Sequence, residues 1–112
     1  GSTDTRTVMR IPPKIAPIKL AVLPLTKKDG LPVIARDIMN ECKPHFRCFY
    51  EEKDTIGKRY RRQDAIGTPF CITVDHQTKE DQTITLRYRD TMLQERVHLD
   101  EIKDRIIKIL ET

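Results

Sequence analysis

Apolar residues along the chain gather in short runs that are typical of buried strands. Residues 18–25 (IKLAVLPL) are nearly all apolar, too few for a helix and rich in branched side chains, which predicts a central strand covered on both faces. Residues 70–74 (FCITV) form a second such run. Residues 45–50 and 83–88 alternate between polar and apolar, and 94–98 is a shorter strand-like segment. We therefore expect five strands.

Three other segments carry apolar residues at helical spacing. The first helix follows a turn at Asp29-Gly30, accepts Pro32 in its first turn and ends before Pro44. Its apolar face consists of Leu31, Ile34, Ala35, Ile38 and Cys42. The second helix is capped by Asp54 or Thr55 and closed by Gly67 in the left-handed conformation. The third is capped by Asp100, and Ile102, Ile106, Ile109 and Leu110 recur in it at helical spacing. Residues 76–81 predict a polar turn.

The resulting order is β-α-β-α-β-β-β-α. Strands that alternate with helices and then close with a hairpin predict an α/β fold with a mixed, mostly parallel five-stranded sheet and helices on both faces. Prolines at 12, 13 and 17 favour an extended arm, so residues 1–16 are expected to be a cloning remnant and linker, and residues 17–112 the domain.

Length and composition place the chain among single-domain globular proteins. It has 112 residues, of which 38% are apolar and 34% charged. No apolar stretch approaches the ~20 residues of a membrane span, and no signal-peptide pattern opens the chain. The three cysteines lack CxxC spacing and sit in apolar surroundings, which indicates reduced, buried thiols in a cytoplasmic protein. The net charge of +4 is compatible with an anionic partner and equally with ordinary solubility.

The most basic segment of the chain lies in the second predicted helix. It contains Lys58, Arg59, Arg61 and Arg62. Within the helix, no acidic residue stands four positions from Lys58 or Arg61; Glu51, Glu52 and Asp54 precede the helix, where they suit its dipole. Helical spacing puts Ile56, Tyr60 and Gln63 on one face and Lys58, Arg61 and Arg62 on the opposite one. An unpaired cationic face of this kind favours nucleic acid over a solvated surface.

A second cationic pair lies on the strand at 83–88 and its end. Arg87 and Arg89 point to the same side of a strand of period two, where guanidinium groups can stack on bases and bond their edges. The alternative is an edge strand protected from aggregation by charge.

Catalytic motifs are absent, and Cys42-x-x-His45-x-x-Cys48 lacks a fourth ligand, so we expect neither a catalytic residue nor a metal site.

Several segments together resemble one family. IAPIK followed by VLPL, then IGKRYRRQDAIGTPFCITVD, then TITLRYRDTMLQERV are similar to the C-terminal anticodon-binding domain of class II glycyl-tRNA synthetase of the homodimeric type. The resemblance covers residues 8–112. The looser pattern I-G-x-R-x-x-x-x-D-x-x-G-x-P is shared with prolyl-, threonyl- and histidyl-tRNA synthetases.

The resemblance implies a three-layer α/β/α domain that binds the anticodon stem-loop of glycine tRNA and is not itself catalytic. ATP and Mg²⁺ would belong to the catalytic domain of a homodimeric, cytoplasmic parent ligase, whereas the isolated domain would be a monomer. The same fold also serves as an interaction module, for example in a polymerase accessory subunit, and that alternative stays open.

Glycine anticodons end in two cytosines, each of which needs an acceptor for its amino group beside a donor. Candidate anticodon readers are Lys53, Asp75, Arg87 and Arg89, together with Glu51 and Glu52. These lie in the regions that threonyl enzymes use. Candidate contacts to the RNA backbone are Lys58, Arg59, Arg61 and Arg62.

Overall fold

The computed structural model describes residues 16–53 and 55–111, so the linker expected before residue 16 lies outside the described residues. Five strands form one sheet: β1 (Leu20–Pro24), β2 (Cys48–Tyr50), β3 (Phe70–Val74), β4 (Thr83–Tyr88) and β5 (Gln94–His98). Four helices are α1 (Leu31–Cys42), α2 (Ile56–Ile66), α3 (His76–Asp81) and α4 (Leu99–Glu111). The first two strands are shorter than the apolar and alternating runs predicted.

The sheet is mixed, as predicted. Its strand order is β2-β1-β3-β4-β5, with β1 parallel to both β2 and β3 and with antiparallel pairing of β3 with β4 and of β4 with β5. It follows that β4 alone runs opposite to the other four strands. The sheet is mostly parallel in the sense that four of its five strands point the same way.

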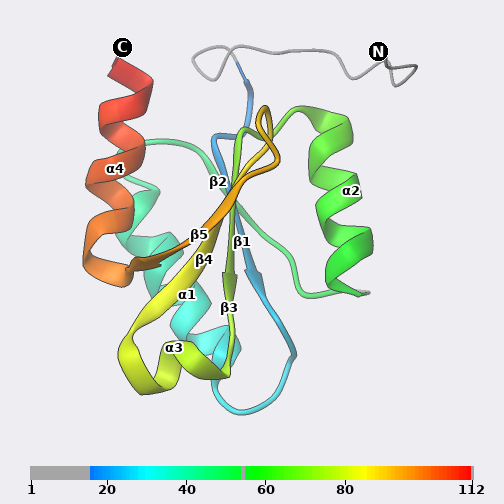
Figure 1. Ribbon diagram of the computed structural model, residues 1–112, viewed down its shortest axis with the longest axis vertical. Helices are drawn as coiled ribbons and strands as arrows, with labels where there is room; N and C mark the ends of the chain where they lie inside the picture. The colour runs from blue at the N-terminus through cyan, green and yellow to red at the C-terminus, as the bar shows by residue number, and fades with distance from the viewer. Residues whose placement is uncertain (1–15, 54, 112) are drawn as a thin grey trace.

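Helices cover both faces of the sheet (Figure 1), which confirms the three-layer α/β/α class. On one face, α1 and α4 bury the main core, built around Leu20, Val22, Ile72, Ile84 and Leu86 of the strands. On the other face, Ile56 and Tyr60 of α2 pack against a smaller cluster of Ala21, Leu23 and Cys71. The opposite-face spacing predicted for α2 is confirmed, since Lys58, Arg61 and Arg62 are exposed and Gln63 is buried.

The segment 76–81 was predicted as a turn and is instead the short helix α3. Asp75 is its N-cap and accepts from the backbone of Thr78 at 3.2 Å, while the Thr78 hydroxyl accepts from the backbone of Asp75 at 3.1 Å. This reciprocal capping box satisfies two backbone donors that a short helix leaves open. Six residues carry too little apolar periodicity for the helix to be recognised in the sequence.

The other predicted helix ends are met with one exception. Thr55 caps α2 by accepting from the backbone of Lys58, and Gly67 closes it at φ 84°. Gly30 precedes α1 at φ 75°. Helix α4 begins at Leu99, so Asp100 lies in its first turn instead of capping it. Among the described residues, no helix has the length and apolar character needed to span a membrane.

Candidate nucleic-acid interface

The fold creates an open edge where its parallel strands end. After β1 the chain crosses one face of the sheet through α1, and after β2 it crosses the other face through α2. Connections that diverge in this way leave a crevice beyond the carboxyl ends of the strands, where open α/β sheets bind ligands. We call this region the carboxyl edge: residues 25–30, 51–53 and 75. The N-terminal turn of α2 begins directly beside it.

The outer face of α2 supplies part of the positive charge next to this edge. Lys58, Arg61 and Arg62 are exposed, as is Lys53 in the segment before the helix. Arg62 forms an ion pair of 2.8 Å with Glu51, whose side chain is only 10% exposed. Glu51 is therefore engaged within the protein, whereas Lys53, Lys58 and Arg61 present their charge to solvent.

Arg59, the remaining cation of the basic segment 58–62, points into the protein. Arg59 is 1% exposed and donates hydrogen bonds to backbone carbonyls at the ends of β1 and β2. The basic segment predicted that Arg59 would hold RNA phosphates together with its neighbours. The structure corrects this placement, because position 59 is one helical residue before Tyr60 and its side chain enters the space between α2 and the strand ends.

Arg87 and Arg89 are also turned inward. They are 8% and 6% exposed, and both side chains reach Asp64 of α2, Arg87 from β4 and Arg89 from directly after it, so they point to the same side as predicted. Arg87 forms a two-point ion pair with Asp64 of α2, whose hydrogen bonds raise the pKa of the guanidinium. Arg89 donates from its Nε to the backbone carbonyl of Asp64 at 3.0 Å. Both side chains expected to reach RNA bases instead contact α2. The edge-strand alternative is wrong, because β4 lies between β3 and β5.

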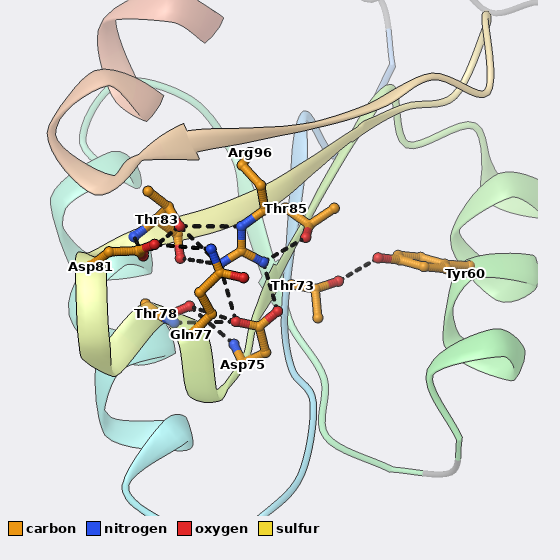
Figure 2. Close-up of polar contacts among 9 residues, drawn as sticks. All are labelled: Tyr60, Thr73, Asp75, Gln77, Thr78, Asp81, Thr83, Thr85 and Arg96. Atoms are coloured by element: carbon orange, nitrogen blue, oxygen red, sulfur yellow. Dashed lines mark hydrogen bonds and ion pairs between the residues drawn. The ribbon is translucent and has the colours of Figure 1, made fainter.

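Asp75 stands at the end of β3 within a dense polar network (Figure 2). Arg96 of β5 binds both of its carboxylate oxygens, at 2.7 and 3.2 Å. The remaining donors of Arg96 are taken by Thr83 and Thr85 of β4. Burial acts to raise the pKa of Asp75, but hydrogen bonds from Arg96 and Thr78 outweigh it, so the pKa lies below its usual value. Asp75 is thus held ionised and in a fixed orientation.

Arg96 and the cations of the loop after β1 were not predicted from the sequence. Arg96 lies opposite Thr85 in the sheet, and the strand pairing that brings it to Asp75 is not readable from local pattern. Lys27 and Lys28 are exposed in the loop after β1. That loop is tied to α3, because His76 bonds the Asp29 carboxylate at 2.8 Å and Lys79 donates to the Asp29 carbonyl at 2.9 Å. The adjacent pair Lys27-Lys28 was the available signal.

The cysteines and histidines do not assemble into a cluster. Cys42 is buried against the core, Cys48 is half-buried in β2, and His45 is exposed between them. Across residues 16–53 and 55–111, no three His, Cys, Asp or Glu side chains lie together as a metal ion would require.

Comparisons with known proteins agree on one family. The model of the family "Anticodon binding domain" matches residues 19–109. The chain is 57% identical to a glycine–tRNA ligase of Treponema denticola, over 92% of the chain and 23% of that protein. It is 51% identical to the glycine–tRNA ligase of Rhodopirellula baltica, over 95% of the chain and 20% of that protein. The chain therefore spans about a fifth of the length of these curated relatives.

A solved structure supports the fold independently. The chain superposes on prolyl-tRNA synthetase from Cryptosporidium parvum with a TM-score of 0.84, covering 92% of this chain and 22% of that one. Sequence identity is 22%, so this likeness concerns the fold alone.

Proposed function

The chain belongs to the anticodon-binding domain family, and we propose that it is the tRNA-binding domain of a glycine–tRNA ligase. The observation that carries this proposal is identity of 51–57% to curated glycine–tRNA ligases over 92–95% of the chain. The alternative of a prolyl-type domain has less support, since the likeness to the prolyl enzyme rests on 22% identity.

In this proposal the domain binds the anticodon stem-loop and so orients the tRNA for a reaction that happens elsewhere. Aminoacylation, with its ATP and Mg²⁺, belongs to the part of the longer ligase outside this chain. The parent is proposed to be a homodimeric cytoplasmic enzyme. Residues 1–16 are proposed to be a cloning remnant and linker arm, and residues 17–112 the domain.

The exposed cations beside the carboxyl edge are proposed to hold the RNA backbone. Lys58, Arg61 and Arg62 lie on the outer face of α2, and Lys53 precedes them. Cations on an outward helix face can follow phosphates without specifying sequence, so their contribution is sensitive to salt. Arg62 would share its charge between RNA and Glu51.

Asp75 is the proposed reader of cytosine. Cytosine carries an exocyclic amino donor, which a fixed carboxylate can accept. Arg96 and Thr78 hold this carboxylate in place at the end of β3, and 23% of its side chain is open to solvent. Arg87 and Arg89 are proposed to act indirectly, by fixing α2 on the sheet, because both are bonded to Asp64.

The test is a fluorescence titration of the chain at fixed salt with three ligands. These are a glycine anticodon stem-loop, the same stem-loop with its anticodon cytosines changed to uracil, and duplex DNA of matched length. We expect the cytosine stem-loop to bind most tightly. Equal affinity for all three would reduce the domain to a general polyanion binder and would overturn the proposal.

A further inference from the structure

The buried guanidinium of Arg59 joins three backbone carbonyls from two different loops. Its NH1 donates to the carbonyl of Pro24 at 2.6 Å and to that of Glu51 at 3.1 Å. Its NH2 donates to the carbonyl of Leu25 at 3.2 Å. One side chain of α2 therefore bridges the end of β1 and the segment after β2, which are 34 and 8 residues away in sequence.

These carbonyls lie where the strands stop pairing. A buried carbonyl that leaves a sheet needs another donor, and Arg59 supplies it. The same backbone segments are tied to their neighbours, since Leu25 donates to the carbonyl of Val74 at 2.8 Å and Glu51 donates to that of Val22 at 3.3 Å. Arg59 thus completes a linked set of strand ends that includes the end of β3, where Asp75 follows.

The charge of Arg59 lies near the carboxylate of Glu51. Burial lowers the pKa of its guanidinium, and the nearby Glu51 carboxylate acts in the opposite direction. Glu51 also pairs with Arg62. The Nε of Arg59 has no acceptor within the described residues. Burying a cation that has an unsatisfied hydrogen-bond donor costs free energy. This cost favours a role for Arg59 in fixing the geometry of the loops over a role in stabilising the fold.

The two loops that Arg59 holds both carry exposed cations. Lys27 and Lys28 follow β1, and Lys53 follows β2. Loops that present charges to a polyanion bind more tightly when their spacing is fixed beforehand, because less freedom is lost on binding. The position of Arg59 beneath both loops is suited to this purpose.

We propose that Arg59 is a positioning residue that holds the 25–30 and 51–53 loops in the arrangement that RNA binds, without contacting RNA itself. This inference rests on the proposed function of the domain. It assigns to Arg59 a role different from that of its exposed neighbours Arg61 and Arg62, although all three belong to the same basic segment.

The test compares Arg59→Lys with Arg61→Met on the exposed face. Arg59→Lys keeps the positive charge but loses the guanidinium that bonds three backbone carbonyls. Hydrogen exchange of backbone amides is measured by mass spectrometry for both loops, with α4 as an internal reference. Affinity for the glycine anticodon stem-loop is measured across a range of salt concentrations. Glu51→Gln keeps the backbone carbonyl that Arg59 bonds and removes the carboxylate charge near Arg59, together with the ion pair to Arg62. It is a second variant that keeps the test decisive if Arg59→Lys does not fold.

For Arg59→Lys we expect faster exchange in both loops, unchanged exchange in α4, and a roughly tenfold loss of affinity with an unchanged salt slope. Glu51→Gln should speed exchange in the same two loops. Arg61→Met should lower the salt slope by about one without altering exchange.

Wild-type exchange and affinity in Arg59→Lys would overturn the inference, and so would a salt slope reduced as in Arg61→Met. If the wild-type domain shows no preference for the stem-loop, the proposed function fails, whereas the exchange data still decide whether Arg59 holds the loops.

Discussion

Arg87 and Asp64 meet in a two-point ion pair that joins β4 to α2. The NH1–Oδ1 and NH2–Oδ2 distances are 2.8 and 3.0 Å, and the guanidinium carbon lies 4.6 Å from the centre of the Tyr60 ring. Tyr60 and Asp64 share α2, so Arg87 contacts two successive turns of that helix. The pair therefore fixes the helix that carries the exposed cations.

Removing Asp64 should destabilise the domain more than an exposed acidic residue would. In Asp64→Ala the nearly buried charge of Arg87 loses its partner, which we expect to lower the free energy of unfolding by about 3 kcal/mol. Urea denaturation measures this. The double variant Asp64→Ala with Arg87→Met should recover part of the loss, because no unpaired charge then remains inside.

Asp90→Ala is the matched control. Its carboxylate pairs with Arg89 at 3.4 Å but is 41% exposed, and Arg89 keeps its hydrogen bond to the Asp64 carbonyl without it. Its removal should therefore cost less than about 1 kcal/mol. An Asp64→Ala loss as small as that of Asp90→Ala would show that the Arg87 pair does not anchor α2.

The outward cations of α2 should control the salt dependence of RNA binding. Each of Lys58→Met and Arg61→Met is expected to reduce the slope of log affinity against log salt by about one, because each removes one proposed phosphate contact. Affinity for the cytosine and uracil stem-loops should fall in equal proportion. Titrations at several salt concentrations provide both quantities.

Lys108→Met serves as the control for net charge, since Lys108 is exposed on α4, across the sheet from α2. It should leave the slope unchanged. A slope reduced equally by all three variants would mean that total charge, and not the α2 face, drives binding.

The fold was predictable because its signals are local. Nearly all-apolar runs mark β1 and β3, Gly67 and Pro44 lie where helices end, and helical periodicity separates the two faces of α2. The helix α3 was not predicted because the interaction that stabilises it, the capping box of Asp75 and Thr78, leaves no apolar pattern in the sequence.

The candidate site was less predictable because an arginine side chain can either be buried against backbone carbonyls or extend into solvent. Arg59 and Arg61 are two positions apart with the same chemistry, yet one is buried against carbonyls and the other is exposed. Helical spacing puts the two residues on opposite faces of α2, but it does not show that Arg59 meets the backbone carbonyls of Pro24 and Glu51. For the same reason, the partnership of Arg96 with Asp75 depends on strand pairing across the sheet.

The thiols should be nearly inert in the folded domain. Burial raises the pKa of Cys42 and Cys71 to about 12 and that of Cys48 to about 11. Because the thiolate is the reactive form, we expect slow reaction with a disulfide reagent at pH 8, and rapid reaction of all three in urea. Absorbance of the released thiol measures both rates.

The same shifts give the stability a direction with pH. A thiol with a raised folded pKa contributes stability that is complete below its ordinary pKa near 9 and is lost as pH rises toward 11–12. The free energy of unfolding should therefore fall above pH 9. Rapid labelling of Cys71 in the native protein would contradict the burial on which this rests.

Asp75→Asn should weaken the preference for cytosine over uracil. A carboxylate only accepts hydrogen bonds and so suits the amino group of cytosine, whereas an amide also donates and can bond the O4 of uracil. We expect the cytosine–uracil difference in binding free energy to shrink by ~1–3 kcal/mol. Paired titrations with the two stem-loops measure this difference.

Asp81→Asn is the control with the same change of net charge. Asp81 is exposed at the end of α3 and bonds Thr83, so its replacement should alter affinity for both stem-loops alike. A ratio of affinities that falls in Asp75→Asn and stays constant in Asp81→Asn assigns discrimination to the carboxylate that Arg96 holds. Loss of the fold does not explain such a result, because the cytosine and uracil affinities come from the same folded sample. An unchanged ratio in Asp75→Asn would instead place cytosine recognition elsewhere on the carboxyl edge.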